Sequence, residues 1–343
     1  MHSKIRIVKR YHYIKMKKVI SLSLSVFLVF AANAQDTKAV VTKTADVSAI
    51  TKEDTTIKKA WDIGGLINIG FSQMAFTNWA AGGQNAMGLS SLLTFHANYR
   101  HGKFKWLNDA QLGYGFQRIG DDGFIQKTTD QIAVNSNAGY KIFDHTLLSV
   151  LVNLQTQFAP GYQYPKDSIL ISRFFAPAYL VMGLGLTYSP KKWFSAFISP
   201  ATARITFVED QMLADEGAFG VTPAVYDTAG NKIKNGKTEL VQIGAYFRAD
   251  FSKELLKNVN LTTTIELFSD YLKNPQNIIV NWVTFMQFKV NKYLAATFNT
   301  QLIYDNNVLI PLYQKENGVN IVVGKGPRLQ FKDVLAVGFA YNL

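Results

Sequence analysis

Large apolar residues recur at every second position in separate segments from Trp61 to the end of the chain. The last segment shows this alternation most clearly, because one parity is large and apolar and the other is small or polar. The apolar parity comprises Leu335, Val337, Phe339, Tyr341 and Leu343. A period of two is typical of β-strands that have two chemically different faces. The chain from Trp61 onward is therefore predicted to be all-β.

Twelve segments carry the alternation. They span residues 62–74, 87–99, 105–118, 129–143, 145–158, 177–188, 193–207, 239–251, 259–270, 278–291, 292–304 and 328–343. Strands of soluble proteins are usually only about five or six residues long. A tilted strand needs about 9–11 residues to cross the hydrocarbon of a membrane. The segment lengths therefore favour a transmembrane, antiparallel up-and-down β-barrel of about twelve strands.

The connections between these segments alternate between long and short. The long ones are 75–86, 119–128, 159–176, 208–238, 271–277 and 305–327. The short ones are 100–104, Asp144 alone, 189–192, 252–258 and the junction of Asn291 with Lys292. Bacterial outer-membrane barrels have short periplasmic turns and long external loops. The alternation therefore predicts a protein of the cell outer membrane with its N- and C-termini in the periplasm.

The first 34 residues have the parts of a secretory signal peptide. The basic region comprises Lys4, Arg6, Lys9, Arg10, Lys15, Lys17 and Lys18. An apolar stretch at 19–32 follows, and Ala32-Asn33-Ala34 is a small-x-small cleavage site. Residues 35–60 are predicted to be a flexible periplasmic tail, followed by the barrel at 61–343. Translation can start at Met1 or at Met16, because Met16-Lys17-Lys18 already opens a complete signal.

Setting the signal aside changes the charge of the chain. The full sequence has 36 basic and 24 acidic residues, a net charge of +12 and a pI of about 9.5. Seven of the basic residues lie in the signal, so the mature chain carries about +5. No nucleic-acid partner is predicted for an exported chain of this charge. The sequence has no cysteine, which excludes thiol catalysis and cysteine-ligated metal sites.

The two faces of the predicted wall meet different surroundings. In hydrocarbon every backbone N–H and C=O needs a partner, and a closed sheet provides one for each. The outward face, rich in Leu, Val, Ile and Phe, is predicted to contact outer-membrane lipids. Aromatic residues near the segment ends fit the girdles found at membrane interfaces. They are Trp61, Tyr99, Trp106, Tyr140, Trp193 and Tyr304.

The inward parity carries amide and charged side chains. The polar candidates facing the lumen are His96, Asp109, Gln111, Asn135, Asn137, Lys141, Gln155, Gln157, Arg204, Arg248, Glu266, Lys289 and Gln301. Four aromatic residues share this parity and would narrow the lumen, namely Phe194, Tyr246, Phe268 and Phe285. Two interpretations remain open: a packed interior in which acids pair with Arg and Lys, and an open polar pore or ligand-binding lumen. Twelve strands enclose a lumen far narrower than that of a sixteen-stranded porin.

No catalytic constellation is visible. A barrel phospholipase needs a Ser beside a His base, and after the signal the chain has only His96, His101 and His145. No Ser motif accompanies His96, and the other two lie at predicted periplasmic turns. A barrel protease needs a His among acids at the external mouth, where Asp121 and Asp122 lie without one. We therefore expect no enzyme activity and no catalytic, cofactor-binding or metal-binding residues.

An ordered set of short motifs resembles a known family. The set comprises Asn78 to Asn85, Phe158 to Tyr162, Ala176 to Tyr179, Ile198 to Pro200, Asn277 to Trp282, Leu302 to Asp305 and Leu329 to Lys332. Over roughly residues 60–343 the chain is similar to a Bacteroidota outer-membrane barrel family of unknown function, the domain-of-unknown-function 3078 family. The resemblance implies an exported barrel and no particular activity. Such barrels often end in Phe, but Leu343 is apolar and in phase, so we expect the C-terminal strand to engage the barrel-assembly machinery.

The leading functional hypothesis is a non-enzymatic outer-membrane barrel, either a narrow channel or a scaffold, with large external loops. One alternative is a partner-binding component of an envelope complex for secretion or uptake, suggested by the tail and the loops. Another alternative is an outer-membrane lipid-modifying enzyme. The sequence leaves open whether the lumen is plugged and whether the loop at 208–238 folds inward.

Overall fold

The computed structural model describes residues 60–74, 86–120, 123, 125–163, 169–291, 293–316 and 319–342. Several sequence predictions lie outside these residues. They concern the signal peptide, the tail before Ala60, the Asn78–Asn85 motif, Asp121, Asp122, Lys292 and Leu343. Within the described residues, no helix is both long enough and apolar enough to span a membrane.

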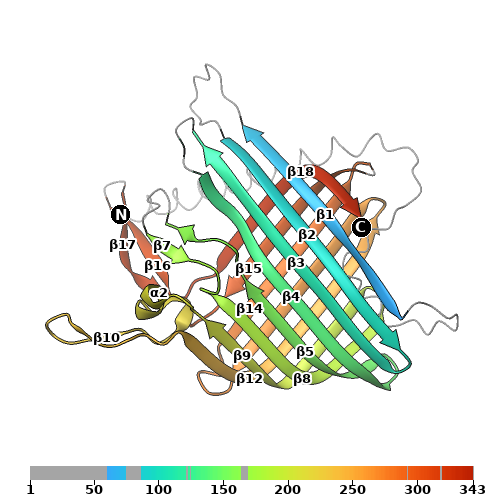
Figure 1. The fold of residues 1–343 in the computed structure, drawn as a ribbon, viewed down its shortest axis with the longest axis horizontal. Helices are drawn as coiled ribbons and strands as arrows, with labels where there is room; N and C mark the ends of the chain where they lie inside the picture. Colours follow the sequence, from blue (N-terminus) through green and yellow to red (C-terminus); the bar gives the residue numbers. More distant parts are fainter. Residues whose placement is uncertain are drawn as a thin grey trace, which may run out of the picture. The chain divides into compact units, whose positions relative to one another are not determined.

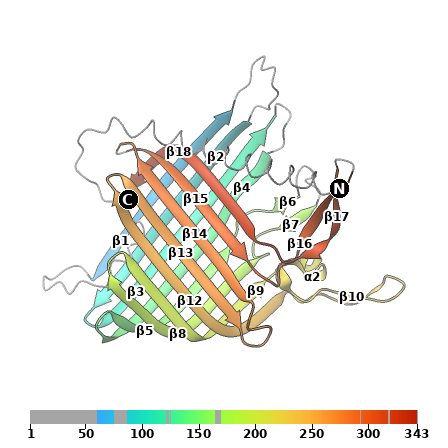
Figure 2. The same cartoon turned by 180° about the vertical axis from the view of Figure 1, so that it is seen from behind.

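Twelve long strands form one closed antiparallel sheet (Figures 1 and 2). They are β1 (Trp61–Met74), β2 (Ala86–His101), β3 (Phe104–Ile119), β4 (Ile125–Phe143), β5 (Thr146–Thr156), β8 (Ala178–Lys191), β9 (Phe194–Phe207), β12 (Glu239–Leu256), β13 (Val259–Asp270), β14 (Ile278–Lys289), β15 (Leu294–Tyr304) and β18 (Gln330–Asn342). Each strand pairs with the long strands before and after it in the chain, and β1 closes the barrel on β18. The predicted all-β, twelve-stranded up-and-down barrel is confirmed.

Short elements interrupt the long connections. Hairpins form from β6 (Gly161–Tyr162) with β7 (Leu170–Ser172), β10 (Val225–Tyr226) with β11 (Lys232–Lys234), and β16 (Ile310–Glu316) with β17 (Val319–Gly326). The loop between β9 and β12 also contains helix α2 (Gln211–Asp215) and the 3₁₀ turn η3 (Ala218–Gly220). These elements gather at one end of the barrel, which we call the loop end (Figures 1 and 2).

The connections at the opposite end, which we call the turn end, are tight. Strand β12 continues to Leu256, so the turn predicted at 252–258 is wrong in extent and contains only Lys257 and Asn258. Asn258 has a φ of 67°, a left-handed conformation that Asn tolerates better than most residues. The alternation of long and short connections is therefore sharper than the sequence indicates.

The wall has two chemically different faces. On β5, Leu148 and Val150 are 47% and 49% exposed, whereas Leu147 and Ser149, which alternate with them along the strand, are buried. Because successive side chains of a strand point to opposite sides, the exposed parity forms an apolar outer surface and the buried parity fills the lumen. The closed sheet meanwhile gives each strand a hydrogen-bonded neighbour on both edges.

One irregularity in β9 reverses this parity. Gly244 of β12 pairs with Thr202, but Tyr246 pairs with Ser199, so β9 contains an extra residue beside Pro200. Pro has no N–H to contribute to the ladder, and a bulge is one of the few places where a strand tolerates it. Side chains before and after the bulge therefore follow different parities.

The bulge corrects one sequence prediction. Phe194 pairs with Phe251 and has the same parity as the exposed Ile198, so it lies on the outer face and its predicted inward position is wrong. Phe197 is buried instead and belongs to an apolar cluster in the lumen with Tyr246. The sequence prediction used one inward parity on both sides of Pro200. That parity is correct for Arg204, which follows the bulge, and incorrect for Phe194, which precedes it.

Aromatic residues cluster at the turn end of the wall. The ring of Trp61 lies 5.1 Å from that of Tyr99 and 6.0 Å from that of Trp106, measured between centroids. On the other side of the barrel, Trp193 lies 5.4 Å from Phe251. Amphipathic rings in such positions are typical of a membrane–water interface.

Candidate functional site

The centre of the lumen is organised by Arg248 on β12. Its guanidinium forms a forked ion pair with Asp250, with Nε 2.9 Å from Oδ2 and Nη2 2.8 Å from Oδ1. Nη1 donates to Glu266 at 3.0 Å and to Asn135 at 3.1 Å. Asp250 and Glu266 are available because they have inward parity on β12 and its neighbour β13. A forked pair of this kind fixes the geometry of the guanidinium as well as its charge.

The bond from Arg248 to Asn135 crosses the lumen. Strands β12 and β4 are separated in the sheet by β9, β8 and β5. Asn135 in turn donates to Asp109 on β3 at 2.9 Å and accepts a hydrogen bond from Asn153 on β5. We call Arg248, Asp250, Glu266, Asn135 and Asp109 the central network. It joins distant parts of the wall through the interior of the barrel.

Glu266 extends the contacts of the central network along the wall. It accepts from the Tyr246 hydroxyl and from the Asn281 amide, each at 2.8 Å. Gln301 then donates to the Asn281 carbonyl at 3.1 Å. Glu266 and Asn281 are direct register partners, whereas Tyr246 and Gln301 each lie two positions from direct register with their partner. The inward parity of four adjacent strands therefore produces one continuous chain of hydrogen bonds.

A second charged group lies nearer the loop end. Arg204 on β9 pairs with Asp305, just after β15, with 3.0 Å between Nη2 and Oδ2. Arg204 also donates to Gln242 at 2.6 Å, and its guanidinium lies 5.2 Å from the centre of the Tyr179 ring. Strands β12, β13 and β14 separate β9 from β15 in the wall. The Arg204–Asp305 pair therefore also spans the lumen.

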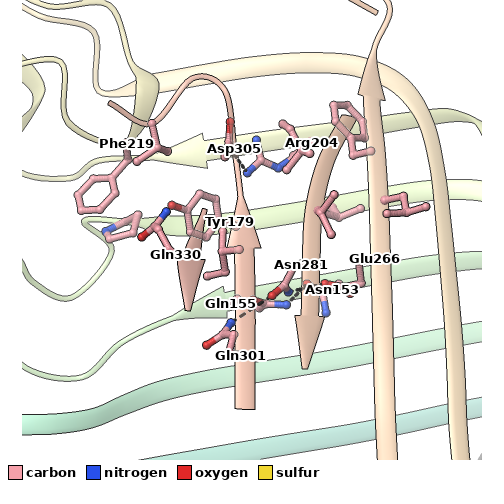
Figure 3. A pocket seen from close by; sticks show the side chains of 18 of the residues that line it. Asn153, Gln155, Tyr179, Arg204, Phe219, Glu266, Asn281, Gln301, Asp305 and Gln330 are labelled. Atoms are coloured by element: carbon pink, nitrogen blue, oxygen red, sulfur yellow. Dashed lines mark hydrogen bonds and ion pairs between the residues drawn. The ribbon is translucent and has the colours of Figure 1, made fainter. Parts of the chain in front are cut away.

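A cavity of about 400 Å³ is lined by residues of both the Arg204–Asp305 pair and the central network (Figure 3). We call it the vestibule. Arg204 and Asp305 contribute from the loop-end pair, and Glu266 contributes from the central network. The remaining lining combines amide side chains with an apolar surface that includes Tyr246 and Phe268. The amide side chains predicted for the inner face thus line a space large enough for a small molecule.

Phe219 reaches the vestibule from the loop between β9 and β12. It has a φ of 57° and lies between Gly217 and Gly220, which have φ values of 71° and 89°. A left-handed conformation is uncommon for a bulky residue and costs on the order of 1–3 kcal/mol. A side chain on Gly220 would also approach Asn307 to 2.8 Å. The loop therefore folds inward at this tight turn and places an aromatic ring at the vestibule.

The base of the same loop is held by packing and by charge. Val208, Leu213, Ala214 and Val221 form a buried apolar cluster with Ala176 of the preceding long loop. These residues join two long connections into one small core, so the loop end is a packed structure over the residues described.

Asp210 adds an electrostatic link between these two loops. Its carboxylate accepts from Arg173 at 3.0 Å and caps α2 through the N–H groups of Met212 and Leu213. Burial alone would raise the pKa of Asp210, but these hydrogen bonds and the Arg173 charge hold it below its usual value. The charged form therefore fastens the start of α2 to the neighbouring loop.

The lumen is filled differently toward the turn end. Asn137 donates to Thr187 at 3.3 Å, and Thr187 donates to Ser149 at 2.9 Å. Ser189 and Ser195 are joined by a hydrogen bond of 2.9 Å. Thr187, Ser149 and Ser189 are at most 1% exposed. Short hydroxyl side chains therefore pack this part of the interior.

The other predicted lumen residues take varied positions. His96, Asp109 and Gln111 line a second cavity of about 100 Å³. Gln155 donates to Asn153 at 3.2 Å, and Gln157 donates to the Arg173 carbonyl at 2.9 Å in the loop beyond β5. Two predicted residues lie at the turn end: Lys141, which pairs with Asp144 at 3.2 Å, and Lys289, the last residue of β14.

Tyr179, Asp305 and Phe219 are vestibule residues that the predicted set did not include. Tyr179 has the inward parity of β8 and lies within the segment predicted at 177–188. Asp305 continues the inward parity of β15 one residue beyond its end, so extending that alternation would have found it. It falls instead in the connection predicted at 305–327. Phe219 lies in a loop with no periodicity, and no sequence signal indicated its position. Within the described ranges, no group of three or more His, Cys, Asp or Glu side chains is arranged to hold a metal ion.

Residues 71–162 match the family model described as protein of unknown function (DUF3078). The family resemblance predicted from the sequence motifs is thereby confirmed over this range, while its restriction to Bacteroidota stays a prediction. A search of curated proteins found no match.

Several solved outer-membrane proteins are similar in chain trace. The COG4313 outer membrane channel from Pseudomonas putida F1 has a TM-score of 0.37 and 10% identity, covering 90% of this chain and 100% of that one. The translocator domain of the autotransporter NalP from Neisseria meningitidis has a TM-score of 0.32 and 10% identity, covering 84% and 90%. The FrpB iron transporter (F3-3 variant) from Neisseria meningitidis has a TM-score of 0.31 and 11% identity, covering 84% and 54%.

Proposed function

We propose that this protein is a non-enzymatic outer-membrane barrel that forms a narrow channel, closed at rest by the central network. The observation that carries the proposal is the pair of bonds from Arg248 Nη1 to Glu266 and, across the lumen, to Asn135. The vestibule lies on the loop-end side of this closure. A solute that enters from that side reaches the central network before it can pass.

The closure is held by charged groups that are already paired with one another. Arg248 has 14% of its side chain exposed, and Asp250 and Glu266 have 16% and 12%. Removing one partner from such a pair leaves a charge with no neutralising neighbour in a poorly solvated interior, which is strongly unfavourable. A passing solute must therefore displace a bound side chain and replace part of its hydrogen bonding. This favours a selective passage over a permanently open pore.

The position in the membrane and the orientation belong to the same proposal. The apolar outer surface supports a lipid-embedded wall, and the aromatic cluster at the turn end supports an interface there. We place the loop end outside the cell and the turn end, with both termini, in the periplasm, because external loops are long and periplasmic turns are short in such barrels.

The channel is tested by single-channel conductance of the refolded barrel in a planar bilayer. We expect the wild type to show rare or no steps, and Arg248→Ala to show frequent steps of stable conductance. Because Arg248→Ala leaves two carboxylates unpaired, a companion triple variant replaces Arg248 by Met, Asp250 by Asn and Glu266 by Gln. That variant removes the charges together and should also open the lumen.

The matched control is Lys234→Ala, which removes a cation from an exposed hairpin outside the lumen. It should behave like the wild type. Each sample is first shown to be folded by heat-modifiable gel migration. Large, persistent wild-type steps would show that the lumen is open at rest. Silence from both folded Arg248 variants would show that this network is not what closes it.

The orientation is tested by labelling single cysteines in intact cells, since the native sequence has no cysteine to interfere. Ala229→Cys lies in the β10–β11 turn at the loop end, and Lys103→Cys lies in the β2–β3 turn. A membrane-impermeant maleimide should label the first and spare the second until the outer membrane is permeabilised. The reverse pattern would invert the proposed topology.

An exposed hairpin favours partner binding as a second candidate function. In β10 and β11, Val225, Tyr226 and Ile233 are 45%, 53% and 67% exposed, and the hairpin projects from the loop end (Figures 1 and 2). Apolar side chains gathered on a projecting element are typical of protein-binding surfaces. Crosslinking through a photoreactive residue at Tyr226 should yield a defined adduct in cells, abolished by Ile233→Ser. Absence of any adduct at native abundance would remove this candidate.

A further inference from the structure

We propose that the vestibule is a binding site for a neutral saccharide of one or two rings. The inference rests on the proposed function in one respect: the ligand must reach the vestibule from the loop end. It is carried by three features of the lining, namely charged groups that leave no uncommitted cation, amide groups with unused hydrogen-bonding capacity and apolar side chains.

The charged groups around the vestibule already have partners within the protein. Arg204 is paired with Asp305 at 3.0 Å, and Glu266 shares Arg248, at 3.0 Å, with Asp250, so two carboxylates face one guanidinium there. Neutral groups also bond to these residues, such as Gln242 to Arg204. An anionic ligand would find no uncommitted cation among these groups, so its charge would be buried without a partner. An uncharged ligand avoids this large desolvation cost.

The amide groups offer both donors and acceptors. Gln155 uses its Nε2 to donate to Asn153 at 3.2 Å, and Gln301 uses its Nε2 to donate to Asn281 at 3.1 Å. Within the described part of the chain, neither amide carbonyl receives a hydrogen bond, and Gln330 makes no side-chain hydrogen bond. A carboxamide has two donor hydrogens and an acceptor oxygen. Such groups match sugar hydroxyls, which both donate and accept.

The vestibule also has apolar lining. Tyr246, Phe268 and Ile279 belong to one buried cluster and line it from the wall. Phe219 lines it from the loop (Figure 3). A pyranose ring has apolar C–H faces and a polar rim of hydroxyls, so a lining that combines apolar and amide side chains complements both parts of that molecule.

The size of the vestibule limits the ligand. Small-molecule sites commonly occupy about 300–1,000 Å³, and the vestibule, at about 400 Å³, is near the lower end. This volume accommodates a mono- or disaccharide and excludes a long chain from lying wholly inside. The central network forms the inner limit, so the ligand is held on the loop-end side of the closure.

Isothermal titration calorimetry on the full folded barrel in detergent tests the proposal. The probes are glucose, lactose, maltose and cellobiose as neutral sugars, with glucuronate as the anionic analogue. We expect at least one neutral probe to bind and glucuronate to bind at least tenfold more weakly. Gln301→Leu should weaken the neutral probe about tenfold, a change of about 1.4 kcal/mol. Phe219→Ala, which lies outside the strands, should weaken it several-fold.

Gln111→Leu is the matched control, because it makes the same change beside the smaller cavity on β3. It should leave the affinity unchanged. No binding by any neutral probe would overturn the inference, as would tighter binding of glucuronate, or binding that Gln301→Leu and Phe219→Ala leave unchanged. These results are independent of conductance. If the Arg248 variants stay silent but the barrel binds sugar, only the channel is contradicted. If those variants conduct but the barrel binds no sugar, only the saccharide site is contradicted.

Discussion

The loop-end and turn-end halves of the lumen are built on the same strands but filled by different kinds of side chain. Around the vestibule, long side chains such as those of Arg204 and Gln301 reach inward. Their terminal groups bond to other side chains, Arg204 to Asp305 and Gln301 to Asn281. Toward the turn end, Ser149, Thr187 and Ser189 are short and almost completely buried. The first arrangement leaves a cavity of about 400 Å³, and the second packs short side chains against one another.

Packing at the turn end is close. A side chain on Gly139 would begin 2.6 Å from Ser149 Oγ and 3.0 Å from Leu147 Cβ. Around the vestibule, in contrast, the side chains meet by hydrogen bonds at their tips, which leaves space beside their stems. One barrel wall therefore supports both a cavity and a closely packed region, because its inward side chains are long around the vestibule and short toward the turn end.

The strongest way to disrupt the loop-end half is to remove Asp305. Asp305→Ala leaves the Arg204 guanidinium, 11% exposed, without its carboxylate. Breaking a buried pair in this way costs about 3–5 kcal/mol, and we expect the lower end because Gln242 and the Tyr179 ring still contact Arg204. The free energy of unfolding is measured by urea titration in lipid vesicles, with tryptophan fluorescence as the signal.

Asp305→Asn provides the control for that experiment. It keeps the side-chain shape and the acceptor used by the Asn307 N–H, but removes the charge. Its loss of stability should be clearly smaller than that of Asp305→Ala. Equal, negligible losses for the two variants would show that the pair does not stabilise the loop-end half.

A matched pair of small-to-large substitutions compares the two halves directly. Ser149→Leu inserts a branched side chain into the packed turn-end half, where overpacking typically costs about 1–3 kcal/mol. Ser172→Leu makes the same change at the lining of the vestibule, which has room to accept it. We expect Ser149→Leu to lower the urea midpoint substantially and Ser172→Leu to lower it little. If Ser172→Leu is the more harmful, the vestibule is not free space.

The sequence predicted the wall better than its contents. Strand period, strand length and alternating connections are local properties, so they identified all twelve barrel strands. The inward parity also identified Arg248, Glu266 and Gln301 as lumen residues. Which of them meet could not be predicted, because the bond from Arg248 to Asn135 joins residues 113 positions apart through the interior.

One prediction error and one open question have specific physical causes. The bulge beside Pro200 shifts the phase of β9 by one residue, so a period-two pattern cannot describe Phe194 and Arg204 together. The inward fold of the loop at Phe219, which the sequence leaves open, depends on left-handed backbone between two glycines and on tertiary packing, neither of which has a periodic signature. Bulges and long loops are therefore the parts of the site that are hardest to predict from sequence.

The hydroxyl chain of the turn-end half predicts a smaller effect. Thr187→Val keeps the shape of the side chain but removes the hydroxyl that accepts from Asn137 and donates to Ser149. A typical intramolecular hydrogen bond contributes about 0.5–1.5 kcal/mol, with more lost when a buried partner is left unsatisfied. We expect a loss of about 1 kcal/mol in the same urea titration. Thr228→Val, in the exposed β10–β11 turn, is the control and should change nothing measurable.

The smallest effect concerns pH and is confined to the loop end. The hydrogen bond from Lys232, followed by that from the Gly236 N–H, holds the pKa of Asp215 below its usual value of 3.8. The hydrogen bond from the Asn231 amide similarly lowers the pKa of Asp227 in the hairpin turn. A carboxyl with a lowered pKa stabilises the folded loop above its usual pKa, and this stabilisation is lost as the pH falls through the lowered value.

The loop between β9 and β12 should therefore loosen below about pH 4, while the barrel wall stays folded. A spin label on Lys234→Cys, the only cysteine in that variant, reports the change as a sharper electron paramagnetic resonance spectrum. Adding Lys232→Ala removes the 2.6 Å contact with Asp215, so the label should already be more mobile at neutral pH and respond less to acid. A spectrum that is independent of pH in both variants would mean that packing around Val208 and Leu213, and not charge, holds the loop.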